Sequence, residues 1–376
     1  MTRHGALSRR GFLQGAARAA GAAALSGCTS IRRAARFRKS GETLNIGVIG
    51  AGGQGRTNWQ AMVACSGTRI AAMCDVDANA LAEAKGWYAE KGLRADFATY
   101  ADYRKMLETE RGLDAVVVST PDHTHARAAI QAMRLGCHAY VEKPLVRTIW
   151  EARYFRQVAK ECGVITQMGN HGSAKDGTRR GIEVLRSGIL GKVTEVHVWT
   201  NRPEISPGNT WGWKQPLRRP EGADPVPAEM SWDLWLGTSP ARPFKKGVYH
   251  RIMWRAFYDF GTGAFGDMAC HTMNLAFRGL ELGEVVAGEA VEISERYEDT
   301  FPQFSKVRLT YAARGAKPPV ELYWYDGYRK PPAEIMPQVI ATLGQVPTTG
   351  CFIMGDKGVM VNTDDYGEFS YIALKG

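Results

Sequence analysis

The sequence predicts an α/β fold in which a doubly wound parallel sheet precedes an α+β domain with a large, open, mainly antiparallel sheet. Three observations carry this prediction. Apolar strand-like runs alternate with helical patterns between residues 44 and 168. The first run ends in a glycine-rich turn, Gly50 to Gly55, which leads into a helical pattern. Beyond residue 169 the alternation stops, and helical patterns give way to consecutive strand-like runs.

The first 27 residues have the pattern of an export signal. Residues 8–13, Ser-Arg-Arg-Gly-Phe-Leu, form a twin-arginine pattern, and residues 16–25 are weakly apolar and too short to span a membrane. Residues 25–28, Leu-Ser-Gly-Cys, resemble a bacterial lipobox. We therefore expect a twin-arginine signal peptide at 1–27, a periplasmic protein and a lipid anchor at Cys28. A plain signal peptide cut nearby is the alternative.

The positive charge of the chain gathers near its N-terminus. The formal net charge is +10, but nine basic residues and no acidic ones lie in residues 1–40, which leaves 39 basic against 38 acidic residues in the remainder. We therefore exclude nucleic acid as the main partner. Residues 28–42 are expected to form a basic tether, which lies against anionic lipid headgroups or is a solvated linker.

The cysteines other than Cys28 show no C-x-x-C pair and no metal-binding spacing. Most of them stand in apolar runs, where a thiol behaves as a small core residue. We expect no metal site.

The glycine-rich turn has the spacing of a dinucleotide-binding motif, Gly50-x-Gly52-x-x-Gly55, between a strand pattern and a helix pattern. Gly50 permits a tight turn, Gly52 a close approach of the pyrophosphate, and Gly55 close packing of helix on strand. We expect these glycines, with Gly53 and Gln54, to bind the cofactor. A glycine-rich turn in some other α/β domain is the alternative.

Asp75 ends the second strand-like run, 20 residues after Gly55. A carboxylate there accepts hydrogen bonds from an adenosine ribose diol and repels a 2′-phosphate. We therefore expect NAD, with NADP disfavoured.

The dinucleotide-binding domain is expected at 43–168. Its further helices are predicted at 78–91, around Tyr100 to Leu107, at 125–135 and at 148–162, and its further strands at 113–119, 138–141 and 164–168.

The second domain is expected at 169–376. Helices are predicted at 175–186 and 266–279, a long proline-rich loop at 202–230, and strands at 192–200, 285–295, 306–311, 320–325, 351–354, 358–361 and 369–372. An open sheet of this kind could serve an interface, so we expect a homo-oligomer.

Three turns fall at strand ends, where doubly wound sheets bind their ligands: residues 119–125, 142–144 and 169–171. A lysine at such an end, Lys143, can polarise a hydroxyl or carbonyl group and move its proton, and the neighbouring Glu142 can hold its side chain. A surface ion pair is the alternative.

Asp267 and His271 lie four residues apart after a glycine-rich entry, so on a helix they share one face. Such a pair suits proton transfer at neutral pH. The alternative, which is more common for this spacing, is a pair on the exposed surface of a helix. We further expect Trp211 and Tyr258 near the substrate, because aromatic faces stack on sugar rings, with core or interface packing as the alternative. His171 follows a strand end and is expected to reach the pocket, with a loop histidine in water as the alternative.

The combination resembles the glucose–fructose oxidoreductase/inositol dehydrogenase/MocA (Gfo/Idh/MocA) family of NAD(P)-dependent sugar and polyol oxidoreductases, in a branch of exported members. The resemblance runs from about residue 43 to the end and rests on Gly50-x-Gly52-x-x-Gly55, Thr120-Pro121 with His125, Glu142-Lys143-Pro144 and Asp267-x-x-x-His271. It implies a Rossmann domain followed by a substrate-binding domain. Thr120, Pro121, His125, Glu142 and Lys143 would contact the cofactor. Lys143 would be the catalytic acid/base, assisted by Asp267 and His271.

Relatives of this branch usually continue with a further helix, so the chain is expected to be truncated or divergent at its C-terminus.

The leading functional hypothesis is an exported NAD(P)-dependent oxidoreductase that moves a hydride between a CH–OH carbon of a sugar, polyol or glycoside and nicotinamide. Because free NAD is scarce in the periplasm, tight binding of the cofactor is expected. Two alternatives stay open. One is an NAD-dependent glycosidase or lyase that works by transient ring oxidation and elimination, although relatives of that kind tend to depart from Glu-Lys-Pro. The other is a non-catalytic sugar-binding protein.

Overall fold

The computed structural model describes residues 35–39, 41–203 and 212–375. The expected signal peptide, Cys28 and Trp211 lie outside these ranges. Across the described ranges, no helix combines the length and apolar character that a membrane span requires.

The first domain is built on a six-stranded sheet in the order β3-β2-β1-β4-β5-β6, with all neighbours parallel. The strands are β1 (Leu44–Ile49), β2 (Thr68–Cys74), β3 (Ala98–Tyr100), β4 (Ala115–Val118), β5 (His138–Glu142) and β6 (Thr166–Gly169). The order reverses between β1 and β4, which is where doubly wound sheets open a ligand crevice at the carboxyl ends of their strands.

Five helices cover the two faces of this sheet. They are α2 (Gln54–Val63), α3 (Ala78–Glu90), α4 (Tyr103–Thr109), α5 (Asp122–Arg134) and α6 (Ile149–Cys162). Side chains of α2 and α3 share one apolar core with the sheet, and those of α4, α5 and α6 share the other. The sequence sets the ends of α6 sharply, because Thr148 and Glu151 form a capping box and Gly163 takes the left-handed conformation.

The second domain is built on a seven-stranded sheet in the order β13-β12-β11-β7-β10-β9-β8, in which only the β7–β10 pair is parallel. The strands are β7 (Val193–Trp199), β8 (Val285–Ile293), β9 (Ser305–Tyr311), β10 (Val320–Tyr325), β11 (Gly350–Gly355), β12 (Gly358–Asn362) and β13 (Ser370–Leu374). Both sheets confirm the predicted fold class.

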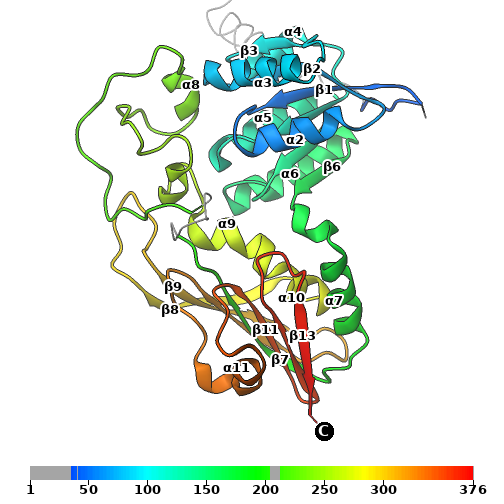
Figure 1. Cartoon of the computed structure of the whole chain (residues 1–376), viewed down its shortest axis with the longest axis vertical. Coiled ribbons are helices and arrows are strands. Elements are labelled where there is room, and N and C mark those ends of the chain that lie inside the picture. Colours follow the sequence, from blue (N-terminus) through cyan, green and yellow to red (C-terminus); the bar gives the residue numbers. More distant parts are fainter. Residues whose placement is uncertain (1–34, 40, 204–211, 376) are drawn as a thin grey trace, which may run out of the picture.

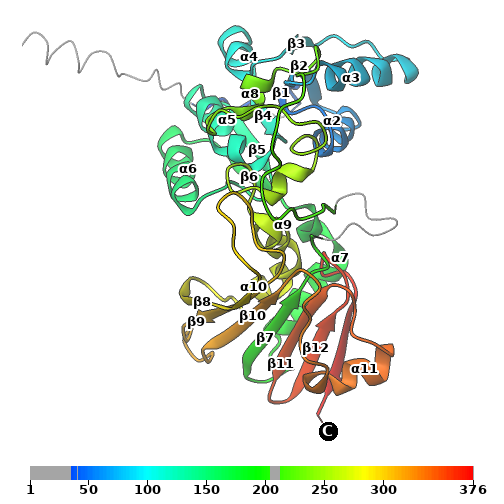
Figure 2. The same ribbon diagram turned by 90° about the vertical axis from the view of Figure 1, so that its left-hand side faces the viewer.

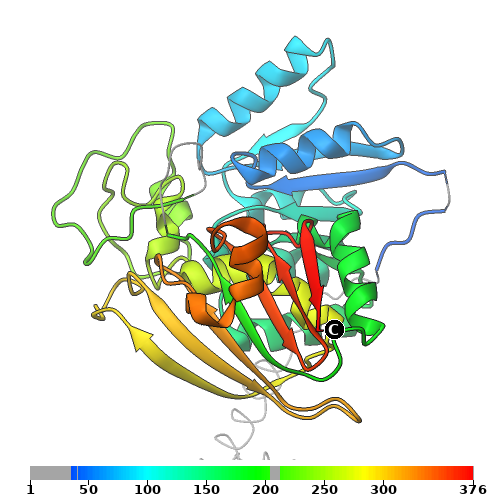
Figure 3. The ribbon, with the colours of Figure 1, turned by 60° about the horizontal axis from the view of Figure 1, so that its bottom comes forward.

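Helices α7 (Asp176–Arg186), α9 (Gly263–Thr272) and α10 (Asn274–Gly279) pack on one face of the second sheet. Figures 1 and 2 show α9 between the two sheets, so it brings second-domain residues to the first domain. The opposite face carries α11 (Pro337–Leu343), which appears in front of the strands in Figure 3.

A long excursion between β7 and α9 returns to the first domain. Its aromatic cluster contains Trp213, Trp232, Trp235, Tyr249 and Phe260. The excursion is fastened by backbone hydrogen bonds from Ala78 to Glu229, from Ser231 to Val76 and from His123 to Phe260. It therefore covers the carboxyl edge of the parallel sheet.

The described part of the expected tether, residues 35–39, is docked on the protein. Arg36 Nη1 donates to the Leu113 carbonyl oxygen at 2.8 Å, and Arg38 Nε lies 2.8 Å from the buried carboxylate of Asp114. These contacts lie at the amino ends of β4 and β5, opposite the crevice. Arg36 and Arg38 are thus engaged by the domain and differ from the solvated or headgroup-bound residues expected here.

The structure also corrects the expected elements in three places. Tyr100 ends strand β3 and does not begin a helix, because residues 98–100 pair with β2. The helix expected at 266–279 is divided at Met273 into α9 and α10. Helices α8 (Trp232–Leu236) and α11 were not predicted; both are short, and α8 stands within a proline-rich segment.

Candidate active site

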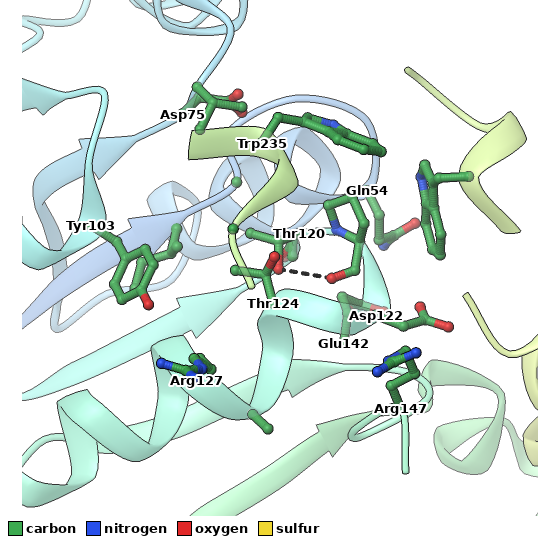
Figure 4. Close-up of a pocket in the computed structure, with 18 of the residues that line it drawn as sticks. Gln54, Asp75, Tyr103, Thr120, Asp122, Thr124, Arg127, Glu142, Arg147 and Trp235 are labelled. Atoms are coloured by element: carbon green, nitrogen blue, oxygen red, sulfur yellow. Dashed lines mark hydrogen bonds between the residues drawn. The ribbon is translucent and has the colours of Figure 1, made fainter. Parts of the chain in front are cut away.

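A cavity of about 1800 Å³ follows the carboxyl ends of β1, β2, β4 and β5 and continues below α9. Figure 4 shows Gln54, Asp75, Thr120, Asp122 and Glu142 around it, together with Trp235 of the long excursion. Both domains line the cavity, which is the arrangement of a site that holds one ligand against another.

The glycine turn is shaped by two positions that leave no room for a side chain. A Cβ on Gly50 would lie 2.7 Å from the Ser119 carbonyl oxygen, and one on Gly55 would lie 1.9 Å from the Gly50 carbonyl oxygen. Gly52, Gly53 and Gln54 line the cavity, and nothing lies within 4 Å of the position that a Gly53 Cβ would take. The start of α2 thus presents an open backbone surface to the cavity.

Asp75 lines the cavity beside the glycine turn, and its carboxylate accepts backbone hydrogen bonds from that turn. Its Oδ2 accepts hydrogen bonds from the backbone N–H groups of Ala51 and Gly52 at 2.8 and 3.1 Å, and its Oδ1 accepts one from Asp77. Burial raises the pKa of Asp75, and these three donors oppose that effect. Because each carboxylate oxygen can accept more than one hydrogen bond, the group keeps capacity for a ribose hydroxyl.

Thr120 and Pro121 line the cavity, but His125 does not. The His125 ring is 1% exposed, with Nε2 2.7 Å from the Thr120 carbonyl oxygen and Nδ1 2.9 Å from the Pro144 carbonyl oxygen. Burial lowers its pKa. The expected cofactor contact of His125 is therefore replaced by a positioning role, in which it ties the turn after β4 to the turn after β5.

Lys143 is held by a partner other than the expected one. Its Nζ donates to Asp267 Oδ1 at 2.7 Å and to the Asp267 carbonyl oxygen at 3.1 Å. The Glu142 carboxylate instead accepts from Asn58 Nδ2 at 2.8 Å and from the Lys143 backbone N–H at 3.3 Å. Sequence adjacency was misleading here, because neighbouring residues on a strand point in opposite directions.

Asp267 is a buried carboxylate between two cations. Arg255 Nε also lies 3.1 Å from its Oδ1. Burial alone would raise the pKa of Asp267, but Lys143 and Arg255 hold it well below its usual range. Burial alone would lower the pKa of Lys143, and Asp267 outweighs that effect and raises it. Lys143 is therefore an ammonium group at neutral pH, with its charge directed into the cavity wall.

His271 lines the cavity on the same face of α9 as Asp267. Its Nδ1 is 2.7 Å from Asn170 Oδ1, while Asn170 Nδ2 donates to the Cys270 carbonyl oxygen. That second bond assigns the amide oxygen to His271, so Nδ1 carries the proton and Nε2 has a lone pair. Burial, helped by the charge of Lys143, lowers the pKa of His271 to about 3. The imidazole is neutral and can accept a proton at Nε2.

The three predicted substrate contacts separate in the structure. His171 lines the cavity, with its ring centroid 5.9 Å from that of His271 and 4.8 Å from that of Tyr366. Tyr258 lies outside the cavity lining and packs on Phe301, at a centroid distance of 4.3 Å. Its expected role at the substrate is not supported by this position. Trp211 lies outside the described residues.

Several residues of the site were not predicted. They are Asn58, Asp122, Asn170, Arg202, Arg255 and Tyr366. Asp122 and Asn170 stand in the strand-end turns that the sequence singled out, so a closer look at those turns could have found them. Arg202, Arg255 and Tyr366 reach the cavity through tertiary packing and carry no local signal.

Asp122, at the start of α5, is a buried carboxyl group whose Oδ2 accepts a hydrogen bond from Thr262 Oγ1 at 2.9 Å. Burial raises its pKa to about 7, against the opposing effect of Arg255. It is the kind of group whose charge changes near neutral pH. No cluster of metal-ligating side chains occurs among the residues that the structure describes.

Two family models match the chain. One, an oxidoreductase family with an NAD-binding Rossmann fold, matches residues 44–170. The other, the C-terminal alpha/beta domain of the same oxidoreductase family, matches residues 179–317. The first range covers the whole parallel sheet, and the second covers strands β7, β8 and β9 of the second sheet together with α9 and α10.

Curated relatives match shorter stretches. A glycosyl hydrolase family 109 protein of Solibacter usitatus is 34% identical over 154 residues, which are 38% of this chain and 35% of that protein. A 2,7-anhydro-N-acetylneuraminate hydratase of Mediterraneibacter gnavus is 26% identical over 175 residues, 46% of this chain and 42% of that protein. The match thus spans well under half the length of either relative.

Solved structures share the fold over most of the chain. The WlbA dehydrogenase of Bordetella pertussis, in complex with NADH and UDP-GlcNAcA, has a TM-score of 0.58 at 16% identity and covers 88% of this chain and 82% of its own. A levoglucosan dehydrogenase in complex with NADH and levoglucosan has a TM-score of 0.59 at 17% identity, covering 89% and 76%.

Proposed function

Because the chain belongs to the Gfo/Idh/MocA oxidoreductase family, whose first domain is an NAD-binding Rossmann fold, we propose that it transfers a hydride between nicotinamide and a CH–OH carbon of a sugar, polyol or glycoside. The observation that carries this proposal is the pairing, across the two domains, of the Lys143 ammonium group with the neutral imidazole of His271. Both side chains line one cavity, next to the carboxyl end of β5.

The residues present fit a dinucleotide. The open backbone at Gly52 and Gly53 would receive the pyrophosphate, Asp75 the adenosine ribose, and Thr120 and Pro121 the nicotinamide end. The carboxylate of Asp75 disfavours a 2′-phosphate, which supports NAD over NADP. Bound NAD supplies the hydride acceptor, or in the reverse direction the donor.

The protein's own groups would handle the proton. In oxidation, the ammonium of Lys143 stabilises the negative charge that develops on the substrate oxygen, and Nε2 of His271 accepts the hydroxyl proton. In reduction the same path runs backwards: the protonated Nε2 of His271 returns its proton to the substrate oxygen, and Lys143 stabilises the negative charge on that oxygen. Asp267 orients Lys143 and Asn170 orients His271, so each reacting group is fixed by a partner outside the reaction.

The sequence features that the structure does not describe extend this proposal. The twin-arginine pattern and Cys28 support an exported protein with a lipid anchor. Outside the cytoplasm a tightly held cofactor would be recycled within the site. The two edge strands of the second sheet, β8 and β13, carry exposed apolar residues, Val286 and Tyr371 among them, which favours a homo-oligomer through this sheet.

The test is to purify the protein without added cofactor, denature it and identify any released nucleotide by absorbance and mass spectrometry. We expect NAD or NADH at close to one per chain. Lys143→Met should keep the nucleotide and lose roughly 10²- to 10⁴-fold in kcat/KM on sugar alcohols. Failure to bind NAD even at high concentration would overturn the proposal.

A second candidate is transient oxidation followed by elimination, which the named glycosidase and hydratase relatives favour. Oxidation of a ring carbon acidifies the adjacent C–H, a base such as His271 removes that proton, and the bond from the next carbon to its oxygen substituent breaks. Water then adds and the hydride returns. Glycosides incubated in deuterated water without external cofactor would gain one deuterium by this route, whereas simple dehydrogenation leaves that position unlabelled.

A further inference from the structure

Arg202 is a buried arginine in the part of the cavity that the second domain builds. It follows β7, is 8% exposed and lines the cavity together with His171, His271 and Tyr366. The Arg202 carbonyl oxygen accepts a hydrogen bond from the Gly327 backbone N–H at 2.8 Å, and its own N–H donates to Thr200 Oγ1 at 3.3 Å. The backbone is thus fixed, so the guanidinium group has a defined place.

Among the described residues, the guanidinium group of Arg202 has fewer hydrogen-bond acceptors than it has N–H donors. Nη1 donates to Asn201 Oδ1. Nη2 lies 3.8 Å from Asp365 Oδ2, which is too long for a hydrogen bond, while Asp365 Oδ1 accepts from Thr349 Oγ1 at 2.6 Å. Nε is buried and has no acceptor among the described residues. Because Nε is buried, Nη2 is the part of the guanidinium group that is left for a ligand carboxylate.

The part of the cavity around Arg202 and Lys143 also holds more positive than negative charge. Asp267 is shared between Lys143 and Arg255. Arg147 also lines the cavity, with Nη1 donated to the Tyr258 carbonyl oxygen and Nε buried without an acceptor among the described residues. Asp122 is only partly ionised at neutral pH because burial raises its pKa to about 7. Among the described residues, Arg202 has a single ion-pair partner, Asp365, at the long distance of 3.8 Å, and Arg147 has none.

Arg202 stands close to the reacting groups. Its charge adds to the effects that lower the pKa of His271, after burial and Lys143, and it also lowers the pKa of Tyr366 against the effect of burial. A group bound by Arg202 would therefore belong to the same sugar whose hydroxyl meets Lys143 and His271.

We propose that the substrate is an acidic sugar, whose carboxylate binds Nη2 of Arg202 while a hydroxyl-bearing carbon of the same molecule lies at Lys143 and His271. This inference rests on the proposed function and names its substrate class. A neutral polyol would leave Nη2 with only the carboxylate of Asp365 at 3.8 Å, whereas a substrate carboxylate at hydrogen-bond distance forms a charge-assisted pair.

The test compares matched acidic and neutral sugars on the NAD-loaded protein. The pairs are glucuronate with glucose, galacturonate with galactose, and mannuronate with mannose, each also as its methyl glycoside. Turnover is followed by nicotinamide absorbance, and binding by quenching of NADH fluorescence. We expect the acidic member of at least one pair to be preferred by about tenfold to a hundredfold, the range of a charged hydrogen bond.

Variants assign the preference to this residue. Arg202→Gln should remove the preference by raising KM or Kd for the acid much more than for the neutral sugar. Arg202→Lys should retain part of it, because the charge stays but the fork is lost. Arg186→Gln is the matched control, since it removes the same charge from an exposed position of the second domain.

The outcomes separate the two proposals. If both members of every pair bind or react equally, or if Arg202→Gln weakens both equally, the acidic-sugar inference is wrong and the oxidoreductase stands. If the protein binds NAD but neither binds nor oxidises any sugar of either class, both proposals fail on this panel, since each requires a sugar ligand.

Discussion

At the scale of single residues, the site depends on two neighbouring bases in different charge states. Lys143 is charged because the carboxylate of Asp267 outweighs its burial, and His271 is neutral because burial and the charge of Lys143 act in the same direction. A cation next to a neutral acceptor can stabilise an alkoxide and take its proton without either group having to change partner.

Asn170 fixes the tautomer of His271, in which Nδ1 carries the proton and Nε2 is free to accept one. Asn170→Ala should lower kcat by about tenfold or more, less than the roughly 10²- to 10⁴-fold expected for His271→Ala, with NAD affinity unchanged. Asn170→Asp places a carboxylate beside the imidazole, raises the pKa of His271, and should move the acid limb of the pH–kcat profile toward neutral pH. An unmoved acid limb in Asn170→Asp would show that the contact is only structural.

Asp122 makes stability depend on pH in a way that has a definite sign. Its pKa is about 7 in the folded protein against 3.8 for an ordinary aspartate. Between these values the folded state holds a proton that the unfolded state has released, so the free energy of unfolding falls as pH rises from about 4 to 7.

Asp122→Asn keeps an acceptor for Thr262 and removes this titration. We expect the variant and the parent to have similar stability near pH 4, and the variant to be more stable at pH 8 by up to a few kcal/mol, since each unit of pKa shift corresponds to about 1.4 kcal/mol. Urea unfolding of both proteins at pH 4.5, 6 and 8 measures the difference. A difference that is the same at all three values would contradict the assignment.

At the scale of elements, the contact of α2 with β1 depends on the absence of a Cβ. Gly55→Ala would place a Cβ 1.9 Å from the Gly50 carbonyl oxygen, so the helix must shift and the glycine turn with it. We expect loss of NAD binding and a large fall in melting temperature.

Gly86→Ala is the control, because Gly86 is exposed within α3 and has nothing within 4 Å of its added Cβ. It should stabilise the protein by about 0.5–1 kcal/mol.

The strands of the first sheet other than β3 could be predicted because each carries its own pattern, whereas Tyr100, at the end of β3, was expected to begin a helix. Buried parallel strands are continuous apolar runs, and the glycine turn and Asp75 stand at a fixed spacing. The roles of His125 and Glu142 could not be predicted, because each depends on a partner that the sequence spacing does not reveal. His125 contacts two carbonyl oxygens, and Glu142 accepts a hydrogen bond from Asn58. Arg202 and Tyr366 reach the site from 59 and 223 residues beyond Lys143 in the sequence.

At the scale of the whole molecule, one carboxylate links three parts of the chain. Asp267 on α9 binds Lys143 of the first domain and Arg255 of the long excursion. The reacting lysine is therefore oriented only when both domains and the excursion are assembled.

Asp267→Asn tests this link. It leaves two buried cations without their shared anion, and loss of a partner from a buried ion pair costs about 3–5 kcal/mol. We expect a lower melting temperature and a wider separation between the unfolding transitions of the two domains in calorimetry. We also expect a lower pKa for Lys143, which would move the basic limb of the pH–rate profile for reduction to lower pH.

Asp96→Asn is the matched control. Its ion pair with Arg94 is exposed, so the substitution should change the free energy of unfolding by less than about 0.5 kcal/mol. If Asp267→Asn unfolded as cooperatively as the parent and kept its pH profile, the carboxylate would be neither the link between the domains nor the group that sets the charge of Lys143.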